Sequence, residues 1–154
     1  MEKETLHFKI GLSGTGTKHP QFKINVDNQN FYQGVLTQAP EVTEYFEFDV
    51  EIEEGEHNLE VELLNKLSTD TVKDNDGNIV DDMLLNIDLI EIDNIDLGVL
   101  RWTGSIYEPI YPDNYTDESQ KQIKQIKNCV NLGWNGVWRL PFTSPYYIWL
   151  LENI

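Results

Sequence analysis

Four aspartates surround one glycine in the stretch DNDGNIVDD, which runs from residue 74 to residue 82 and precedes a strongly apolar segment. Calcium takes six to eight oxygen ligands from carboxylates, carbonyls and waters, so carboxylates crowded into one loop are candidate ligands. An EF-hand frame with Gly77 in sixth position puts Val72 first and Met83 last, so that frame fails. The loop is either a calcium site of another geometry or a solvated turn, since Asp-Asn-Asp-Gly is also a good turn sequence. The candidate metal ligands are Asp74, Asp76, Asp81 and Asp82, with Asp70 nearby.

No catalytic constellation accompanies this loop, and we expect no enzyme. The histidines are scattered, at His7, His19 and His57. Cys129 has no basic cluster beside it and is interpreted as a buried structural thiol. The glycine-rich stretch GLSGTGT lacks the Gly-Lys-Ser/Thr ending of a phosphate loop and is interpreted as a flexible hairpin or loop. Glu53 and Glu56 would serve as a glycosidase pair, but carboxylates are so common here that the pair has no specificity.

Charge and composition exclude several classes of partner. Eleven basic residues against twenty-seven acidic ones give a net charge of −16, which repels nucleic acids and anionic membranes. A single cysteine excludes an internal disulfide, and no run approaches the ~20 apolar residues of a membrane span. The N-terminus shows no apolar signal region. The location is left open, with extracellular and virion-associated both compatible.

Period-two patterns predict strands through the first two thirds of the chain. Apolar residues alternate with polar ones over 6–12 and 22–26, and the stretch DNQN then makes a short turn. Residues 45–64 read as a hairpin that turns at Gly55. In 83–102 the apolar phase changes, which indicates a bulge or burial of both faces, before a last strand ends at Trp102. The prediction is an all-β fold, an antiparallel β-sandwich of jelly-roll type.

The pattern changes after residue 103. Residues 1–103 carry a net charge of −15 and residues 104–154 only −1, so we predict a sandwich module followed by a C-terminal extension packed on the same domain. Asp117 as N-cap, with isoleucines at helical spacing, predicts a helix over 117–133. The tail beyond it is rich in aromatic residues, and its two prolines argue against a central strand.

The stretch from Phe22 to Gly98 resembles the small calcium-dependent carbohydrate-binding modules that bind xylan and related polysaccharides. The matching segments are FKINVDNQ, NLEVELLN and DMLLNIDLI, separated by the Asp loop. They cover about half of the chain. Asp82 falls on the aspartate that ends the family's loop, and Leu85, Ile87, Asp88 and Ile90 fall on the following strand.

The resemblance implies a calcium ion that ligates sugar hydroxyls directly. Calcium is then the expected cofactor, and Asp76, Asn78 and Asp82 are the residues expected to meet the glycan. The chain departs from the family at two places. It has Met83-Leu84 where the family has Arg-Asn, and Asn65-Lys66 where the family has Asn-Asp, so that a cation replaces a carboxylate. Residues 104–154 have no counterpart.

The preferred hypothesis is a non-catalytic, calcium-dependent, lectin-like carbohydrate-binding module. The alternative is a structural or assembly protein, such as a virion or appendage component, that uses the sandwich as a scaffold and forms homo-oligomers or larger assemblies. Its motivation is the aromatic tail, because tryptophan and tyrosine are enriched in interface anchors. The same residues would otherwise cover an open face of the sandwich: Trp134, Trp138, Tyr146, Tyr147, Ile148 and Trp149.

Overall fold

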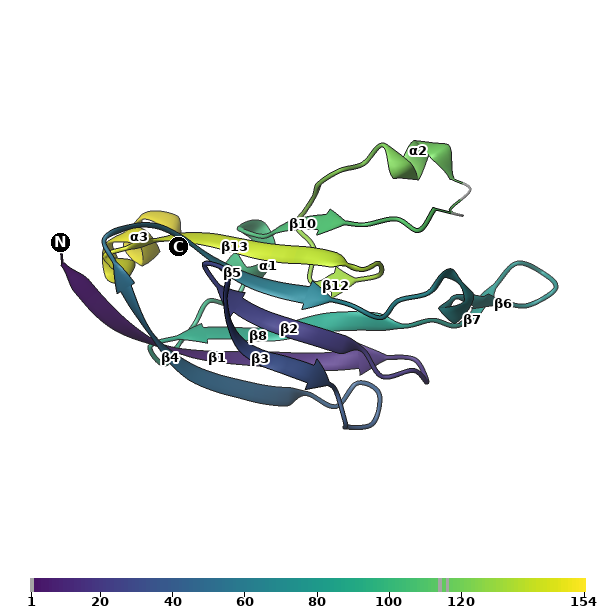
Figure 1. Cartoon of the computed structure of the whole chain (residues 1–154), viewed down its shortest axis with the longest axis horizontal. Coiled ribbons are helices and arrows are strands. Elements are labelled where there is room, and N and C mark those ends of the chain that lie inside the picture. Colours follow the sequence, from purple (N-terminus) through teal and green to yellow (C-terminus); the bar gives the residue numbers. More distant parts are fainter. Residues whose placement is uncertain (1, 114, 116) are drawn as a thin grey trace.

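Residues 2–113, 115 and 117–154, which the computed structural model describes, form two large antiparallel sheets packed against each other (Figure 1). The first sheet has the order β12-β8-β1-β4, with β9 paired to β8. Its strands are β1 (Lys3–Thr15), β4 (Glu44–Glu53), β8 (Leu84–Ile92), β9 (Ile95–Asp96) and β12 (Asn131–Leu132). The predicted all-β antiparallel sandwich is confirmed.

The second sheet has the order β11-β10-β13-β5-β2-β3. Its strands are β2 (Gln21–Val26), β3 (Gln29–Val35), β5 (Gly55–Leu63), β10 (Ile106–Pro109), β11 (Ile126–Lys127) and β13 (Gly136–Ser144). A separate small hairpin joins β6 (Val72–Lys73) to β7 (Ile79–Asp81). The helical elements are short: η1 (Ser68–Asp70), α1 (Leu100–Thr103), α2 (Glu118–Lys121) and α3 (Tyr146–Asn153).

The core lies between the two sheets and follows the alternation in the sequence. In β1, Leu6, Phe8 and Ile10 are fully buried, while the side chain of His7 between them keeps 38% of its surface exposed. His7 hydrogen-bonds with Glu47 and Asp49 on the neighbouring strand β4. The acidic residues therefore lie mainly on outer faces, where their charge is solvated.

The segment predicted as a hairpin over 45–64 is not one. Both strands exist, but β4 pairs with β1, whereas β5 pairs with β2 and β13 in the other sheet. The chain crosses between the sheets at Gly55, whose φ of +129° favours glycine. The turn predicted at DNQN is confirmed, because Asp27 and Asn28 both have positive φ between the paired strands β2 and β3.

The phase change in 83–102 reflects a bulge, one of the two readings of the sequence. Gly11 lies opposite Leu89 but Leu12 lies opposite Ile87, so β8 has one extra residue at Asp88. The prediction of a last strand that ends at Trp102 is wrong. The short helix α1 occupies that position instead.

The helix predicted over 117–133 is largely wrong. Asp117 does cap a helix, since its side chain accepts a hydrogen bond of 3.0 Å from the Gln120 backbone N–H. That helix ends at Lys121. Beyond it the chain is extended because Ile126 pairs with Tyr107 at the edge of the second sheet, and 131–132 join the first sheet. The isoleucine spacing was compatible with a helix, but sheet pairing determines the structure.

The C-terminal part of the chain supplies a strand to the middle of the second sheet. β13 lies between β10 and β5, and its Trp138, Leu140 and Phe142 belong to the core. Pro141 is tolerated because β10 pairs with β13 only as far as Arg139, which leaves one side of the strand free at the proline.

The two ends of the sandwich differ in character (Figure 1). Helix α3 lies at one end, close to the N-terminus, while the β6–β7 hairpin and α2 extend from the opposite end. We name this opposite end the loop end. Within the described part of the chain, no helix is long and apolar enough to cross a membrane.

Candidate functional site

The Asp loop forms the turn of the β6–β7 hairpin. The Asp74 carboxylate accepts hydrogen bonds of 2.9 Å from the backbone N–H groups of Asp76 and Asn78. Gly77 has a φ of +83° and donates its N–H to the Asp74 carbonyl oxygen at 3.1 Å. The side chain of Asp74 therefore stabilises the turn itself, as aspartates at turns commonly do.

Asp81 fastens the end of this hairpin to the turn after β1. Its carboxylate accepts hydrogen bonds from the hydroxyl of Thr17 at 2.6 Å and the backbone N–H of Thr17 at 3.3 Å. The hydroxyl bond is the main reason that the pKa of Asp81 lies below its usual value. Gly16 comes so close that a Cβ there would lie 1.5 Å from the Asp82 carbonyl oxygen. Only glycine fits this position.

Asp82 is paired with Lys66, and this pair joins the two sheets at the loop end. Lys66 follows β5 and Asp82 precedes β8, and the Lys66 Nζ lies 2.6 Å from the Asp82 Oδ1. The Lys66 side chain is only 1% exposed, against 23% for Asp82. The same ammonium donates to the Met83 carbonyl oxygen at 2.8 Å. Asp82 Oδ1 also accepts from the Thr71 hydroxyl at 2.8 Å.

A second lysine–aspartate pair holds the start of the same segment. The Lys18 Nζ donates to Asp70 at 2.8 Å and to the Asn65 carbonyl oxygen at 2.7 Å. Partial burial would raise the pKa of Asp70, but the Lys18 ammonium and the Leu67 backbone N–H outweigh it, so this pKa is lowered. Two internal cations thus neutralise two of the carboxylates in 70–82.

The carboxylates predicted as calcium ligands are not gathered round one point. Among residues 2–113, 115 and 117–154, no group of three or more His, Cys, Asp or Glu side chains is placed to hold a metal ion. Asp74 and Asp81 accept from neighbouring donors, Asp82 accepts from an ammonium, and Asp76 lies exposed in the turn. The residues present therefore do not fit a calcium centre as they stand. Calcium ligation by these residues stays a prediction.

Trp134 packs against the Lys66–Asp82 pair. The Lys66 Nζ lies 5.2 Å from the centroid of the Trp134 ring, which is a cation–π contact. The buried Tyr107 fixes the Trp134 backbone, because its hydroxyl donates to the Trp134 carbonyl oxygen and accepts from the Trp134 N–H at 3.1 Å. The neighbouring Asn135 side chain accepts the Lys66 backbone N–H at 2.7 Å. Lys66 and Trp134 are therefore positioned as one unit.

Two tyrosines extend this unit outward. The rings of Tyr111 and Tyr115 stack with centroids 5.3 Å apart, and each meets the Trp134 ring edge-on, at 6.2 Å and 5.0 Å. We call Tyr111, Tyr115 and Trp134 the aromatic platform. All three side chains are half-buried, which leaves part of each ring accessible.

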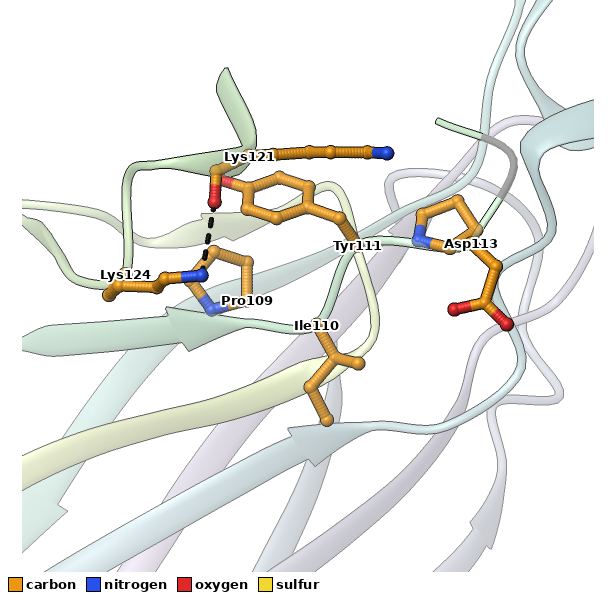
Figure 2. Close-up of a pocket in the computed structure, with 7 residues that line it drawn as sticks. Pro109, Ile110, Tyr111, Asp113, Lys121 and Lys124 are labelled. Atoms are coloured by element: carbon orange, nitrogen blue, oxygen red, sulfur yellow. Dashed lines mark hydrogen bonds between the residues drawn. The ribbon is translucent and has the colours of Figure 1, made fainter. Parts of the chain in front are cut away.

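An open cleft of about 420 Å³ borders the platform (Figure 2). Tyr111, Lys121 and Lys124 line it, and the Lys124 ammonium donates to the Lys121 carbonyl oxygen at 3.3 Å. The other lining residues are Pro109, Ile110, Pro112 and Asp113. A second open cleft, of about 520 Å³, shares Pro109, Ile110 and Lys124 with the first and continues over the outer face of the second sheet.

Sequence reasoning missed Tyr111, Tyr115 and Lys66 as site residues. The tyrosines lie in a segment without periodicity, so no pattern assigned them to the loop end. The sequence did contain one signal for Lys66, the replacement of an expected carboxylate by a cation. The sequence assigns Trp134 only to the aromatic tail, but it precedes the start of β13, whereas α3 follows the end of that strand.

The remaining candidate residues lie away from the platform. Glu53 ends β4 and Glu56 lies in β5, on opposite sides of the Gly55 crossing and in different sheets. Cys129 is half-buried in an extended segment, and burial raises the pKa of its thiol. This placement is compatible with the structural role expected of it.

The fold is similar to that of a carbohydrate-binding module. The structure of vCBM60 in complex with galactobiose matches with a TM-score of 0.50 and 12% identity, covering 87% of this chain and 96% of that one. A selenomethionine form of vCBM60 matches with a TM-score of 0.50 and 13% identity, over 88% of this chain and 89% of that one. Its description links two families of calcium-dependent carbohydrate-binding modules by circular permutation. No protein-family model matches the chain, and no curated protein matches its sequence. At this identity the similarity shows a shared fold.

Proposed function

We propose that this protein is a non-catalytic carbohydrate-binding module. The main support is the end-to-end match to a module that was solved with a galactose disaccharide, covering 96% of that module. The sandwich of the present chain also carries, at its loop end, a cleft with an aromatic wall. Binding sites for small molecules are commonly concave, with aromatic walls and a few polar groups that fix orientation.

The glycan is proposed to lie in the cleft beside Tyr111. One face of a pyranose ring is largely C–H and packs on an aromatic ring, while its hydroxyl groups need hydrogen-bond partners. The ammonium groups of Lys121 and Lys124 are donors, and the carboxylate of Asp113 is an acceptor. The aromatic platform holds Tyr111 in place through Trp134. The second cleft offers room for a chain of more than one sugar unit.

Glycan binding is tested by affinity electrophoresis and a glycan array, with galactobiose as the first soluble probe. The protein is stripped with chelator and measured with and without added calcium, so that calcium is a variable of the experiment. Tyr111→Ala is expected to weaken binding at least ~10-fold, the equivalent of about 1.4 kcal/mol. Tyr147→Ala is the matched control, because Tyr147 is a 50% exposed tyrosine on α3 at the opposite end. Absence of binding to any glycan in either condition, or equal loss in both variants, would overturn the proposal.

The second candidate function is assembly with other protein chains through α3. This helix exposes a row of large apolar side chains, namely Tyr147, Ile148 and Leu151, with Ile154 at its end. A location that is extracellular or virion-associated is proposed for either candidate. Sedimentation of the wild-type chain beside Leu151→Glu tests self-assembly. A concentration-dependent dimer that the substitution abolishes would support it, and a monomer at high concentration would count against it.

A further inference from the structure

We infer that the Lys66 ammonium takes the place of a divalent cation at Asp82, so that the loop end of this sandwich is organised without calcium. The sequence predicts calcium at Asp82, and the structure places a buried positive charge of the chain itself there. The inference concerns the cation alone and stands whether or not the protein binds glycans.

The groups around the Lys66 Nζ are oxygen atoms of the kinds that calcium takes as ligands. They are a carboxylate oxygen of Asp82 at 2.6 Å and the backbone carbonyl oxygen of Met83 at 2.8 Å. An ammonium has three N–H donors. Two of them meet these oxygens, and the charge also faces the Trp134 ring at 5.2 Å. The ammonium thus has partners from two other segments of the chain, residues 82–83 and Trp134.

The lysine is also held from its backbone, so its position is not that of a mobile surface side chain. The Lys66 N–H donates to the Asn135 side chain at 2.7 Å, and the Asn135 side chain donates back to the Lys66 carbonyl oxygen at 3.2 Å. With 1% of its side chain exposed, Lys66 has no route to solvent without breaking these contacts. A metal ion could reach the Asp82 oxygen only by displacing a like charge that is already bound there.

The Oδ1 oxygen of Asp82 already accepts several hydrogen bonds and has little room for a metal ion. It accepts from Lys66, from the Thr71 hydroxyl at 2.8 Å and from the Met83 backbone N–H at 2.8 Å. The neighbouring carboxylates do not supply a second cage, because Asp81 is bound to Thr17 and Asp74 to its own turn. The Asp82 Oδ1 and the Asp81 and Asp74 carboxylates are thus already used by donors of the chain itself.

The test compares calcium responses of the full chain and of two Lys66 variants. Chelator-stripped wild-type protein is titrated with calcium chloride in a calorimeter, with magnesium as control, and melted with chelator or with ~10 mM calcium. A site with a Kd of ~10 µM would raise Tm by roughly 8–16 °C under that calcium concentration. We expect no saturable heat and a Tm change below ~1 °C, well under that shift. Lys66→Asp is expected to melt at lower temperature in chelator and to regain part of the loss in calcium.

Lys66→Met is the milder variant, kept in case Lys66→Asp does not fold, and it is expected to show a smaller calcium-dependent rise in Tm. Lys18→Asp is the matched control, because it removes the cation from Asp70 and leaves Asp82 paired. One saturable calcium site in the wild-type chain that Asp82→Asn removes would overturn the inference. Two results would overturn the assignment of this position to a cation. One is no calcium-dependent rise in Tm in either Lys66 variant, and the other is a rise of the same size in Lys18→Asp.

Discussion

Removal of the Lys66 charge should destabilise the protein more than removal of any surface lysine. Lys66→Met keeps most of the aliphatic stem but deletes the ammonium, and so leaves Asp82 without its cation. Breaking a fully buried ion pair from one side costs about 3–5 kcal/mol. Because the Asp82 side chain is 23% exposed, water solvates part of the unpaired charge, and we expect a loss of about 2–3 kcal/mol in the free energy of unfolding. For a chain of this size that corresponds to a drop in Tm of roughly 4–12 °C.

Urea denaturation followed by tryptophan fluorescence measures this loss, and the exposed Lys3–Glu51 pair provides the internal standard. The two side chains are 55% and 64% exposed, so Lys3→Met should cost only about 0–1 kcal/mol. A double-mutant cycle then isolates the pair. Asp82→Asn alone leaves the buried ammonium unpaired. The double variant Asp82→Asn with Lys66→Met removes both charges, so its loss in the free energy of unfolding should be at least ~1 kcal/mol smaller than the sum of the two single losses. Strict additivity, or equal losses for Lys66→Met and Lys3→Met, would refute the reasoning.

Three further predictions address other parts of the molecule. Gly16→Ala should cost at least ~2 kcal/mol in urea denaturation, because φ is +92° and a Cβ would meet a backbone carbonyl at 1.5 Å, whereas Gly34→Ala, with open space around it, should be neutral. Hydrogen bonds of the His7 ring with the carboxylate of Glu47, and next with that of Asp49, raise the pKa of His7. Because the pKa of His7 is higher in the folded state, protonation of His7 stabilises the protein fully below the unfolded pKa of 6.5. This stabilisation is lost as pH rises through the folded pKa. His7→Gln should therefore reduce the fall in the free energy of unfolding that the wild-type protein shows above about pH 6. Deletion of residues 104–154 removes β13 from the middle of a sheet and should abolish cooperative unfolding by circular dichroism, and a soluble truncation with a sharp transition would contradict this.

The strands were predictable because their signal is local. Alternation of apolar and polar residues marks which face of a strand is buried, and the core residues of β1 and β5 follow it. The partner of each strand is not a local property. β5 pairs with β13, whose Trp138 lies opposite Val61 although the two are far apart in the sequence. A tight turn at Gly55 suits both a hairpin and a crossing between sheets, so the sequence could not distinguish them.

The sequence predicted a possible turn at the Asp loop but not the partners of its carboxylates. The loop does form the turn of the β6–β7 hairpin. The spacing of the aspartates could not show that Thr17, Lys18 and Lys66 would arrive from other segments and use the carboxylates as acceptors. The aromatic platform was invisible for the same reason, since Tyr111 and Trp134 meet only after β10 and β13 have paired.

A buried lysine and a calcium ion would organise the loop end with different consequences. An ion that binds from solution links the structure of the site to its concentration, whereas the Lys66 ammonium is present whenever the chain is folded. It neutralises Asp82 and at the same time holds the Trp134 ring against which Tyr111 packs. If glycan binding persists in chelator, the aromatic platform is sufficient, and Lys66→Met should weaken binding through Trp134 although it touches no sugar. If glycan binding requires calcium while Asp82→Asn leaves that requirement intact, the ion binds outside the Lys66–Asp82 pair, and the exposed carboxylates of Asp76 and Asp113 become the first residues to substitute.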